Sequence, residues 1–203
     1  GRYILTVGRF VPEKGYHDLV AAFARLQDAG EVNRSTVSSQ RSDCGLAAAG
    51  GWKLVIVGDA DHEDDYSRKL KSDAAATPGV ILTGRLTGLP LQEIYSNAGL
   101  FVLPSYYEGL PIVLLEAMSY GLNCIVSDIP ANREVALSAE RYFQPGDIDG
   151  MAAKMAEFVQ RPLSVRERAQ QLELIAREYD WGVIARKTLD VYTELLAACS
   201  RRS

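Results

Sequence analysis

The strongest constraint on the fold of this chain is a regular alternation of short apolar runs with longer helical patterns. The apolar runs span residues 3–7, 53–57, 80–82, 100–103 and 123–127. Helical periodicity marks residues 18–28, 65–75, 91–97 and 111–119. Near-continuous apolar strands are typical of a parallel sheet covered on both faces, and intervening helices indicate βαβ units. The sequence therefore predicts an α/β fold with a doubly wound, Rossmann-like parallel sheet.

The last part of the chain is predicted to contain helices only. They cover residues 147–160, 164–179 and 181–200. Ser164 and Glu167 have the spacing of a capping box, which marks the start of the second of these helices. A chain of 203 residues has the length of one domain. We therefore expect a single domain over residues 1–203 with a helical C-terminal tail.

Residues 31–50 do not fit the alternating pattern. They are rich in small polar residues and show little periodicity. Loops of this length inside compact domains are usually functional or disordered. Low hydrophobicity favours disorder over a functional lid, so we expect a mobile or disordered loop at 31–50.

The composition limits which partners this protein can bind and in which compartment it is expected. A net charge of −4 argues against broad nucleic-acid binding, which needs clustered Lys and Arg. The three cysteines are odd in number and lack metal-ligand spacing, which indicates reduced thiols in a cytoplasmic protein, with Cys124 in an interior strand. No apolar stretch approaches the roughly 20 residues of a membrane span. Arginines near 161–168 and 201–202 leave peripheral association with a membrane surface open.

In an open α/β sheet, ligands bind outside the carboxyl ends of the strands. The first strand is followed by GRFVPEKG, residues 8–15, in which Gly8 and Gly15 bracket two cations. Arg9 can grip two phosphate oxygens at once, and Lys14 adds a compact charge. This loop is a candidate diphosphate clamp. The alternative is a solvated turn with two ordinary cations.

The next two strands also end in glycine. Gly58 permits a ligand to approach the backbone closely, and Arg85 follows the glycine after the third strand. The carboxylates of Asp59 and Asp61 are suited to Mg²⁺ or Mn²⁺. Acids before a helix are more often solvated and favoured by the helix dipole, so we expect no metal here. After the fifth strand, Asp128 is a candidate to orient ligand groups or to cap a helix.

Two acids lie eight positions apart in PSYYEGLPIVLLEAMSYG. A helix from Pro111 to about Gly121 would place Glu108 just before its positive end and Glu116 inside it. Glu116 has apolar neighbours, so it is either a buried carboxylate that needs a partner or a solvent-facing residue at the helix edge. The backbone N–H groups of residues 109 and 110, Gly109 and Leu110, are placed to meet an anion.

These motifs, in this order, resemble the C-terminal, donor-binding domain of GT-B glycosyltransferases, specifically the retaining family GT4. GRFVPEKG is similar to that family's Gly-Arg-x4-Lys-Gly loop, and KLVIVGDA to its second strand. EGLPIVLLE is similar to its Glu-x7-Glu signature, and WGVIARKTLDVYTELL to its closing helix. The likeness covers nearly the whole chain apart from residues 31–50.

The resemblance implies roles for the site residues. Arg9 and Lys14 would neutralise the diphosphate of a nucleotide-sugar donor, and Glu108 would contact hydroxyls of the transferred sugar. Gly109 and Leu110 would place their amides beside it.

The resemblance assigns the second acid, Glu116, to the nucleoside end of the donor. Glu116 would accept hydrogen bonds from the ribose diol, and Arg85 would lie near the base. The family's Gly-Gly after the fifth strand is absent, because Ala131 and Asn132 occupy those positions.

The implied function is transfer of a sugar from a UDP-, GDP- or ADP-sugar to a sugar, lipid-linked or small-molecule acceptor, with retention and without a metal or cofactor. GT-B enzymes bind the acceptor mainly through an N-terminal domain, which the resemblance implies is absent from this chain, leaving the isolated domain inactive. A non-catalytic nucleotide- or sugar-binding module is the main alternative. A dinucleotide domain is disfavoured because no strand-to-helix turn carries Gly-x-Gly-x-x-Gly, and a metal-dependent GT-A enzyme would leave the other motifs unexplained.

Overall fold

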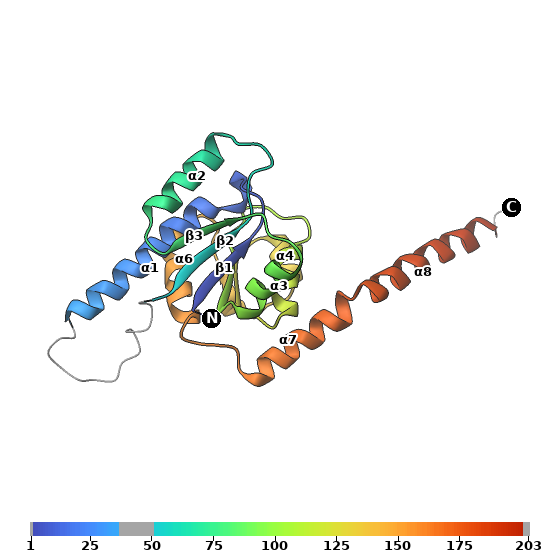
Figure 1. The fold of residues 1–203 in the computed structure, drawn as a ribbon. Helices are drawn as coiled ribbons and strands as arrows, with labels where there is room; N and C mark the ends of the chain where they lie inside the picture. The colour runs from blue at the N-terminus through green and yellow to red at the C-terminus, as the bar shows by residue number, and fades with distance from the viewer. Residues whose placement is uncertain (1, 37–50, 201–203) are drawn as a thin grey trace.

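The computed structural model describes residues 2–36 and 51–200 and shows a central sheet with helices on both faces (Figure 1). Within these residues, six strands form one parallel sheet in the order β3-β2-β1-β4-β5-β6. The strands are β1 (Tyr3–Val7), β2 (Lys53–Val57), β3 (Val80–Gly84), β4 (Leu100–Leu103), β5 (Cys124–Ser127) and β6 (Tyr142–Phe143). This order is that of a doubly wound sheet, so the fold prediction is confirmed.

The helices follow the predicted alternation with differences at their ends. They are α1 (Tyr16–Thr36), α2 (Asp65–Ala76), α3 (Gly88–Asn97), α4 (Ile112–Ser119), α5 (Pro130–Glu134), α6 (Ile148–Phe158), α7 (Val165–Glu178) and α8 (Trp181–Ser200), with short 3-10 helices η1 (Pro12–Lys14) and η2 (Ala139–Arg141). Because α1 continues to Thr36, the predicted loop is wrong for residues 31–36. Residues 37–50 of that loop lie outside the described residues. The sequence did not predict β6 or α5, which are too short to show a period.

Each face of the sheet has its own core. Ile4 and its neighbour Leu5 are both fully buried, although their side chains leave β1 on opposite faces. Ile4 belongs to the core formed with α1, α2 and α6, and Leu5 to the core formed with α3, α4 and α7. Burial on both faces explains why the strands read as unbroken apolar runs. Cys124 is buried in β5, as expected.

The two C-terminal helices differ in how they contact the rest of the domain. α7 begins with the predicted capping box of Ser164 and Glu167 and packs against α4. Its buried Gln171 donates hydrogen bonds to the carbonyl oxygens of Met118 and Leu122, each at 3.0 Å. α8 then extends away from the body of the domain (Figure 1). Among the described residues, no helix combines the length and apolarity that a membrane crossing requires.

The strand order reverses between β1 and β4, and the loops that follow these two strands press together there. Gly15 has a φ of +65°, and a Cβ at this position would lie 2.3 Å from the carbonyl oxygen of Pro104. The N–H of Tyr106 donates to the carbonyl oxygen of Glu13 at 2.8 Å. The loop after β2 is equally close, since a Cβ on Gly58 would lie 1.8 Å from the carbonyl oxygen of Gly8. The carboxyl edge of the sheet is therefore a packed surface of three loops.

Gly15→Ala should destabilise the domain, because the added Cβ meets backbone and the backbone is left-handed. We expect a loss of about 2 kcal/mol or more in the free energy of unfolding, measured by urea denaturation. The matched control is Gly109→Ala, where φ is not positive and nothing lies within 4 Å of the added Cβ. Its stability should stay within about 0.5 kcal/mol of the parent protein. Equal effects of the two substitutions would contradict the close packing of these loops.

Candidate functional site

The centre of the candidate site is an ion pair across the two packed loops. Lys14, the last residue of η1, places its Nζ 2.7 Å from Oε1 of Glu108 in the loop between β4 and α4. The two side chains are only 17% and 7% exposed. Ser105 donates from its Oγ to the same Oε1 at 2.7 Å. The structure thus brings together two of the predicted catalytic residues and shields their charges from solvent.

The loop that carries Glu108 is tied to the start of α1. Tyr106 donates from its hydroxyl to Oδ2 of the buried Asp18 at 2.5 Å, and its ring stacks on His17 at a centroid distance of 6.2 Å. The hydrogen bond to the Asp18 carboxylate, with burial second, raises the pKa of Tyr106 to about 12. The phenol therefore stays protonated at neutral pH and remains a donor.

Arg9 lies at a neighbouring part of the same edge. With Gly8, Gly58 and Arg85 it lines a cavity of about 170 Å³ above the ends of β1 and β2. Its Nη1 lies 3.2 Å from Oδ2 of Asp61, and Nη2 of Arg85 lies 2.8 Å from Oδ1 of the same carboxylate. The guanidinium of Arg9, and then that of Arg85, hold the pKa of Asp61 below its usual value. The predicted cation and both predicted glycines therefore converge here.

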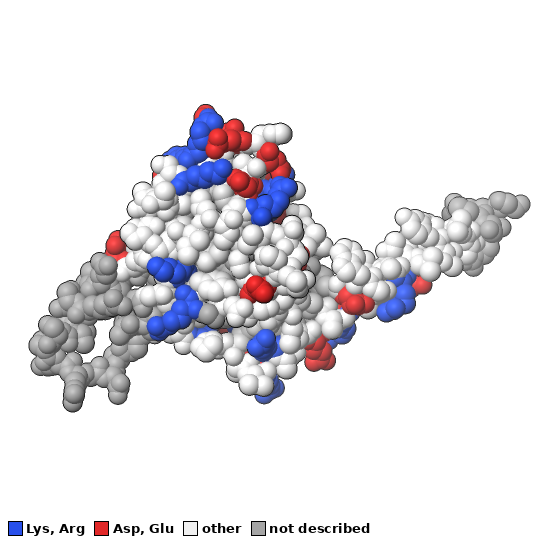
Figure 2. All heavy atoms as spheres, in the orientation of Figure 1, with Lys and Arg blue, Asp and Glu red and all other residues white. Residues whose placement is uncertain are grey.

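Lys, Arg, Asp and Glu side chains gather at the end of the molecule that carries α2, with the two signs intermixed (Figure 2). Asp59 pairs with Lys71 at 3.0 Å, and Asp61 with the two arginines. Within residues 2–36 and 51–200, no group of three or more His, Cys, Asp or Glu side chains is placed to hold a metal ion. The expectation of a metal-free reaction stays a prediction.

Glu116 is exposed, so its interpretation as a buried carboxylate is wrong and the solvent-facing alternative is correct. The reason is the period of α4: Ile112, Glu116 and Ser119 share one face, while the opposite face enters the core. The hydroxyl of the buried Tyr95 donates to Oε2 of Glu116 at 2.9 Å. Burial, followed by the charge of Glu116, raises the pKa of Tyr95, which keeps this phenol protonated.

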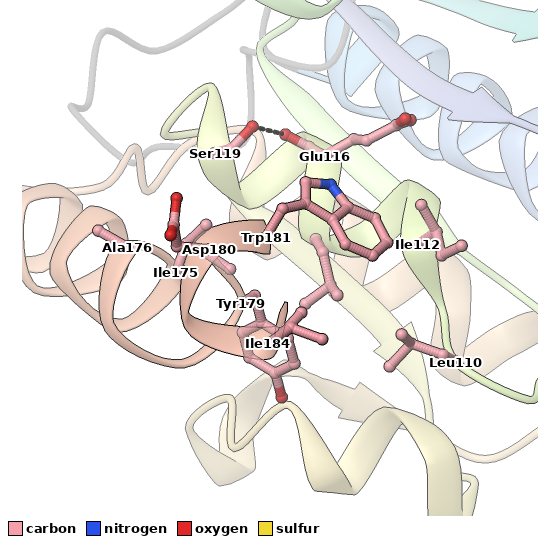
Figure 3. A pocket seen from close by; sticks show the side chains of 11 residues that line it. Leu110, Ile112, Glu116, Ser119, Ile175, Ala176, Tyr179, Asp180, Trp181 and Ile184 are labelled. Atoms are coloured by element: carbon pink, nitrogen blue, oxygen red, sulfur yellow. Dashed lines mark hydrogen bonds between the residues drawn. The ribbon is translucent and has the colours of Figure 1, made fainter. Parts of the chain in front are cut away.

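The exposed face of α4 also borders an apolar pocket of about 420 Å³. Its walls come from α4 and the loop before it, the end of α7, the start of α8 and the residues between these two helices: Leu110, Ile112, Leu115, Glu116, Ser119, Ile175, Ala176, Tyr179, Asp180, Trp181 and Ile184. In Figure 3 the indole of Trp181 lies between Glu116 and Ile112, and the carboxylate of Glu116 points away from it. Trp181 is 75% exposed at this pocket, whereas Trp52 is buried in the core.

The remaining predicted residues have more local roles. Gly109 and Leu110 are exposed in the loop just before α4. Both carboxylate oxygens of Asp128 accept hydrogen bonds from Arg133. The N-cap residue of α5 is Ile129, and no side chain caps this helix, so the predicted capping role of Asp128 is wrong. Asn132 is buried, and its Nδ2 donates to the carbonyl oxygen of Ser127 at 2.9 Å. It supports the end of β5 where the resembling family has glycine.

Sequence reasoning missed several residues that hold the site. Ser105 lies three positions before Glu108, which was an available local signal. Asp18 and Tyr106 are 88 positions apart, and Tyr95 is 21 positions from Glu116, so neither pairing leaves a local pattern.

The family described as glycosyl transferases group 1 matches residues 1–178. Glycogen synthase of Mycobacterium tuberculosis is 28% identical over 195 residues, which cover 93% of this chain and 42% of the relative. The α-maltose-1-phosphate synthase of Mycolicibacterium smegmatis is 32% identical over 207 residues, which cover 94% of this chain and 47% of the relative. The chain therefore spans less than half the length of these two relatives.

Solved structures agree on the fold. Alr3699/HepE of Anabaena, solved in complex with UDP-glucose, superposes with a TM-score of 0.71 at 16% identity, covering 96% of this chain and 49% of that chain. Likeness at this level of identity establishes the shared fold. With the family match over residues 1–178, it confirms the resemblance to the GT-B glycosyltransferases: the chain belongs to the glycosyl transferases group 1 family.

Proposed function

We propose that this chain is the donor-binding part of a retaining glycosyltransferase that uses a nucleoside-diphosphate sugar. The observation that carries the proposal is the contact between Lys14 and Glu108 at the point where the strand order reverses. A cation for the leaving diphosphate and an acid for the sugar hydroxyls lie side by side there. The Anabaena structure in complex with UDP-glucose supports a nucleotide-sugar donor on this fold.

In the proposed reaction, negative charge builds up on the departing nucleoside diphosphate. Lys14 and Arg9 stabilise that charge, and the backbone that carries them is already in place. The loop after β1 is held by the N–H of Gly15 donating to Pro12 and by the N–H of Phe10 donating to Asp59. Because these contacts exist before the donor binds, the backbone of this loop needs little reorganisation during transfer. No metal or cofactor is part of the proposal.

The two acids recognise different ends of the donor. Glu108 receives hydroxyls of the transferred sugar, with its Oε1 already held by Ser105 and Lys14, and the amides of Gly109 and Leu110 lie beside it. Glu116 receives the ribose diol. Since Tyr95 donates to its Oε2, the carboxylate is oriented and its second oxygen is left for a ribose hydroxyl.

We further propose that the intact enzyme contains an N-terminal domain that binds the acceptor, and that this chain alone transfers sugar poorly or not at all. The relatives support this, because the chain spans 42% and 47% of their lengths. The acceptor is a sugar, a lipid-linked sugar or a small molecule. A cytoplasmic location is proposed from the buried, unpaired thiol of Cys124.

The diphosphate assignment predicts that the chain binds UDP, GDP or ADP and that Arg9→Ala and Lys14→Ala each weaken binding about tenfold or more, because each removes a charge-assisted hydrogen bond. Isothermal titration measures the affinities. Lys154→Ala on α6 and Arg177→Ala on α7 are the matched controls, since each removes the same charge from a helix outside the loop after β1. Binding that survives both site substitutions unchanged would contradict the proposed function.

The acid assignments predict different ligand dependence for the two glutamates. Glu108→Gln should lower the affinity for the nucleotide sugar at least about fivefold. The affinity for the nucleoside diphosphate should stay the same or rise, because Lys14 loses its internal partner. Glu116→Gln should weaken both ligands to a similar extent. Titration of each variant with a nucleoside diphosphate and its glucose conjugate separates the two. Equal losses for both ligands in Glu108→Gln would place that acid away from the sugar.

A further inference from the structure

One carboxylate at the edge of the sheet is shared by two arginines from different loops. Arg9 follows β1, Asp61 follows β2, and Arg85 follows β3. The two oxygens of Asp61 divide the partners, with Oδ2 3.2 Å from Arg9 and Oδ1 2.8 Å from Arg85. The three side chains are 60%, 49% and 64% exposed in that order, so a dissolved ligand can reach them. The geometry is that of two guanidinium groups converging on one anion.

The floor beside these arginines is backbone. The cavity of about 170 Å³ that both arginines line is also lined by Gly8 and Gly58. A Cβ at Gly58 would lie 1.8 Å from the carbonyl oxygen of Gly8, so no side chain fits at this position. Because neither glycine carries a side chain, the cavity stays open above the strand ends, and Arg9 and Arg85 line one part of it. A carboxylate and a phosphate both present a pair of oxygens to which the two parallel N–H groups of a planar guanidinium can donate.

The surrounding charges leave Asp61 as the counter-ion of this pair. Asp59 is the acid that lines the cavity, but it has its own partner: it lies 3.0 Å from Lys71, which also lies 3.5 Å from Glu63. Exposed ion pairs such as those of Asp61 are weak and readily exchanged. A diphosphate carries more charge than one carboxylate and offers more acceptor oxygens, so it competes well for the two arginines.

We propose that Arg9 and Arg85 together form a binding site for a phosphate group of the donor, and that Asp61 occupies this site in the free protein until a phosphate displaces it. The inference rests on the proposed donor-binding function and deepens it. It changes the role of Arg85 from a neighbour of the base to a ligand of the diphosphate. Asp61 becomes an internal competitor that sets the affinity for anions, rather than a metal ligand.

The test uses the whole chain, with inorganic pyrophosphate as the probe for the anion alone and UDP, GDP and ADP as probes for the nucleotide. Asp61→Asn should tighten pyrophosphate and nucleoside diphosphates about three- to tenfold, because it removes the competitor and keeps the shape. Arg85→Ala should weaken both about tenfold. In the Arg85→Ala background, Asp61→Asn should increase the affinity for these anions less than about twofold, because one of the two arginines that it frees is absent.

Asp65→Asn is the matched control, because it makes the same change in net charge at the exposed start of α2, where Asp65 pairs with Arg68. Its affinities should equal those of the parent chain. Tightening by Asp65→Asn as large as that by Asp61→Asn would reduce the effect to net charge and overturn the inference.

The remaining outcomes separate the inference from the function beneath it. If Arg9→Ala weakens binding but Asp61→Asn and Arg85→Ala change nothing, the shared site is refuted and the proposed donor function stands. An equal gain from Asp61→Asn with and without Arg85 also refutes the shared site. If neither pyrophosphate nor any nucleoside diphosphate binds the parent chain or Asp61→Asn, the proposed function fails, and the inference fails with it.

Discussion

The packing of the loop after β1 against the loop after β4 is the constraint on which the candidate site depends. Gly15 lies against the carbonyl of Pro104, and the N–H of Tyr106 bonds to the carbonyl of Glu13. These backbone contacts join two segments that are far apart in the sequence, and they leave Lys14 facing Glu108 at 2.7 Å. Because the strand order reverses between β1 and β4, the helices that follow them lie on opposite faces, and the edge between stays open to a ligand.

The second organising feature is that the cations of the site are neutralised by the protein's own acids. Lys14 pairs with Glu108, and Arg9 and Arg85 share Asp61. An anion that binds must therefore replace an existing ion pair, so its measured affinity is a difference between two interactions. Pairing of this kind disfavours weakly charged anions more than diphosphates, because a single charge gains little by the exchange. It also fits a chain with a net charge of −4, in which positive charge is local rather than spread over a surface.

The sequence was sufficient for the fold because burial on both faces of the sheet leaves a direct record in the strands, as Ile4 and Leu5 illustrate. It was also sufficient to place Gly8, Gly58 and Lys14, since strand ends can be read from those runs. The orientation of Glu116 was not predicted, although the spacing of Ile112, Glu116 and Ser119 held the signal. Its apolar neighbours suggested burial, whereas the helical period decides exposure. Partners such as Tyr95 become visible only when α3 and α4 are placed on the same face.

The placement of the site at a sheet edge explains why one domain supplies only part of the proposed reaction. Glu108 is shielded by its own loop, but Arg9 and Arg85 stay largely open to solvent. Sugar transfer needs a pocket from which water is kept away, since water competes with the acceptor for the activated sugar. A single edge offers one wall. In the proposed enzyme the N-terminal domain supplies the second wall. Closure of the two domains would remove solvent from Arg9 and Arg85. Their electrostatic interaction with the diphosphate would then be stronger while negative charge develops on it.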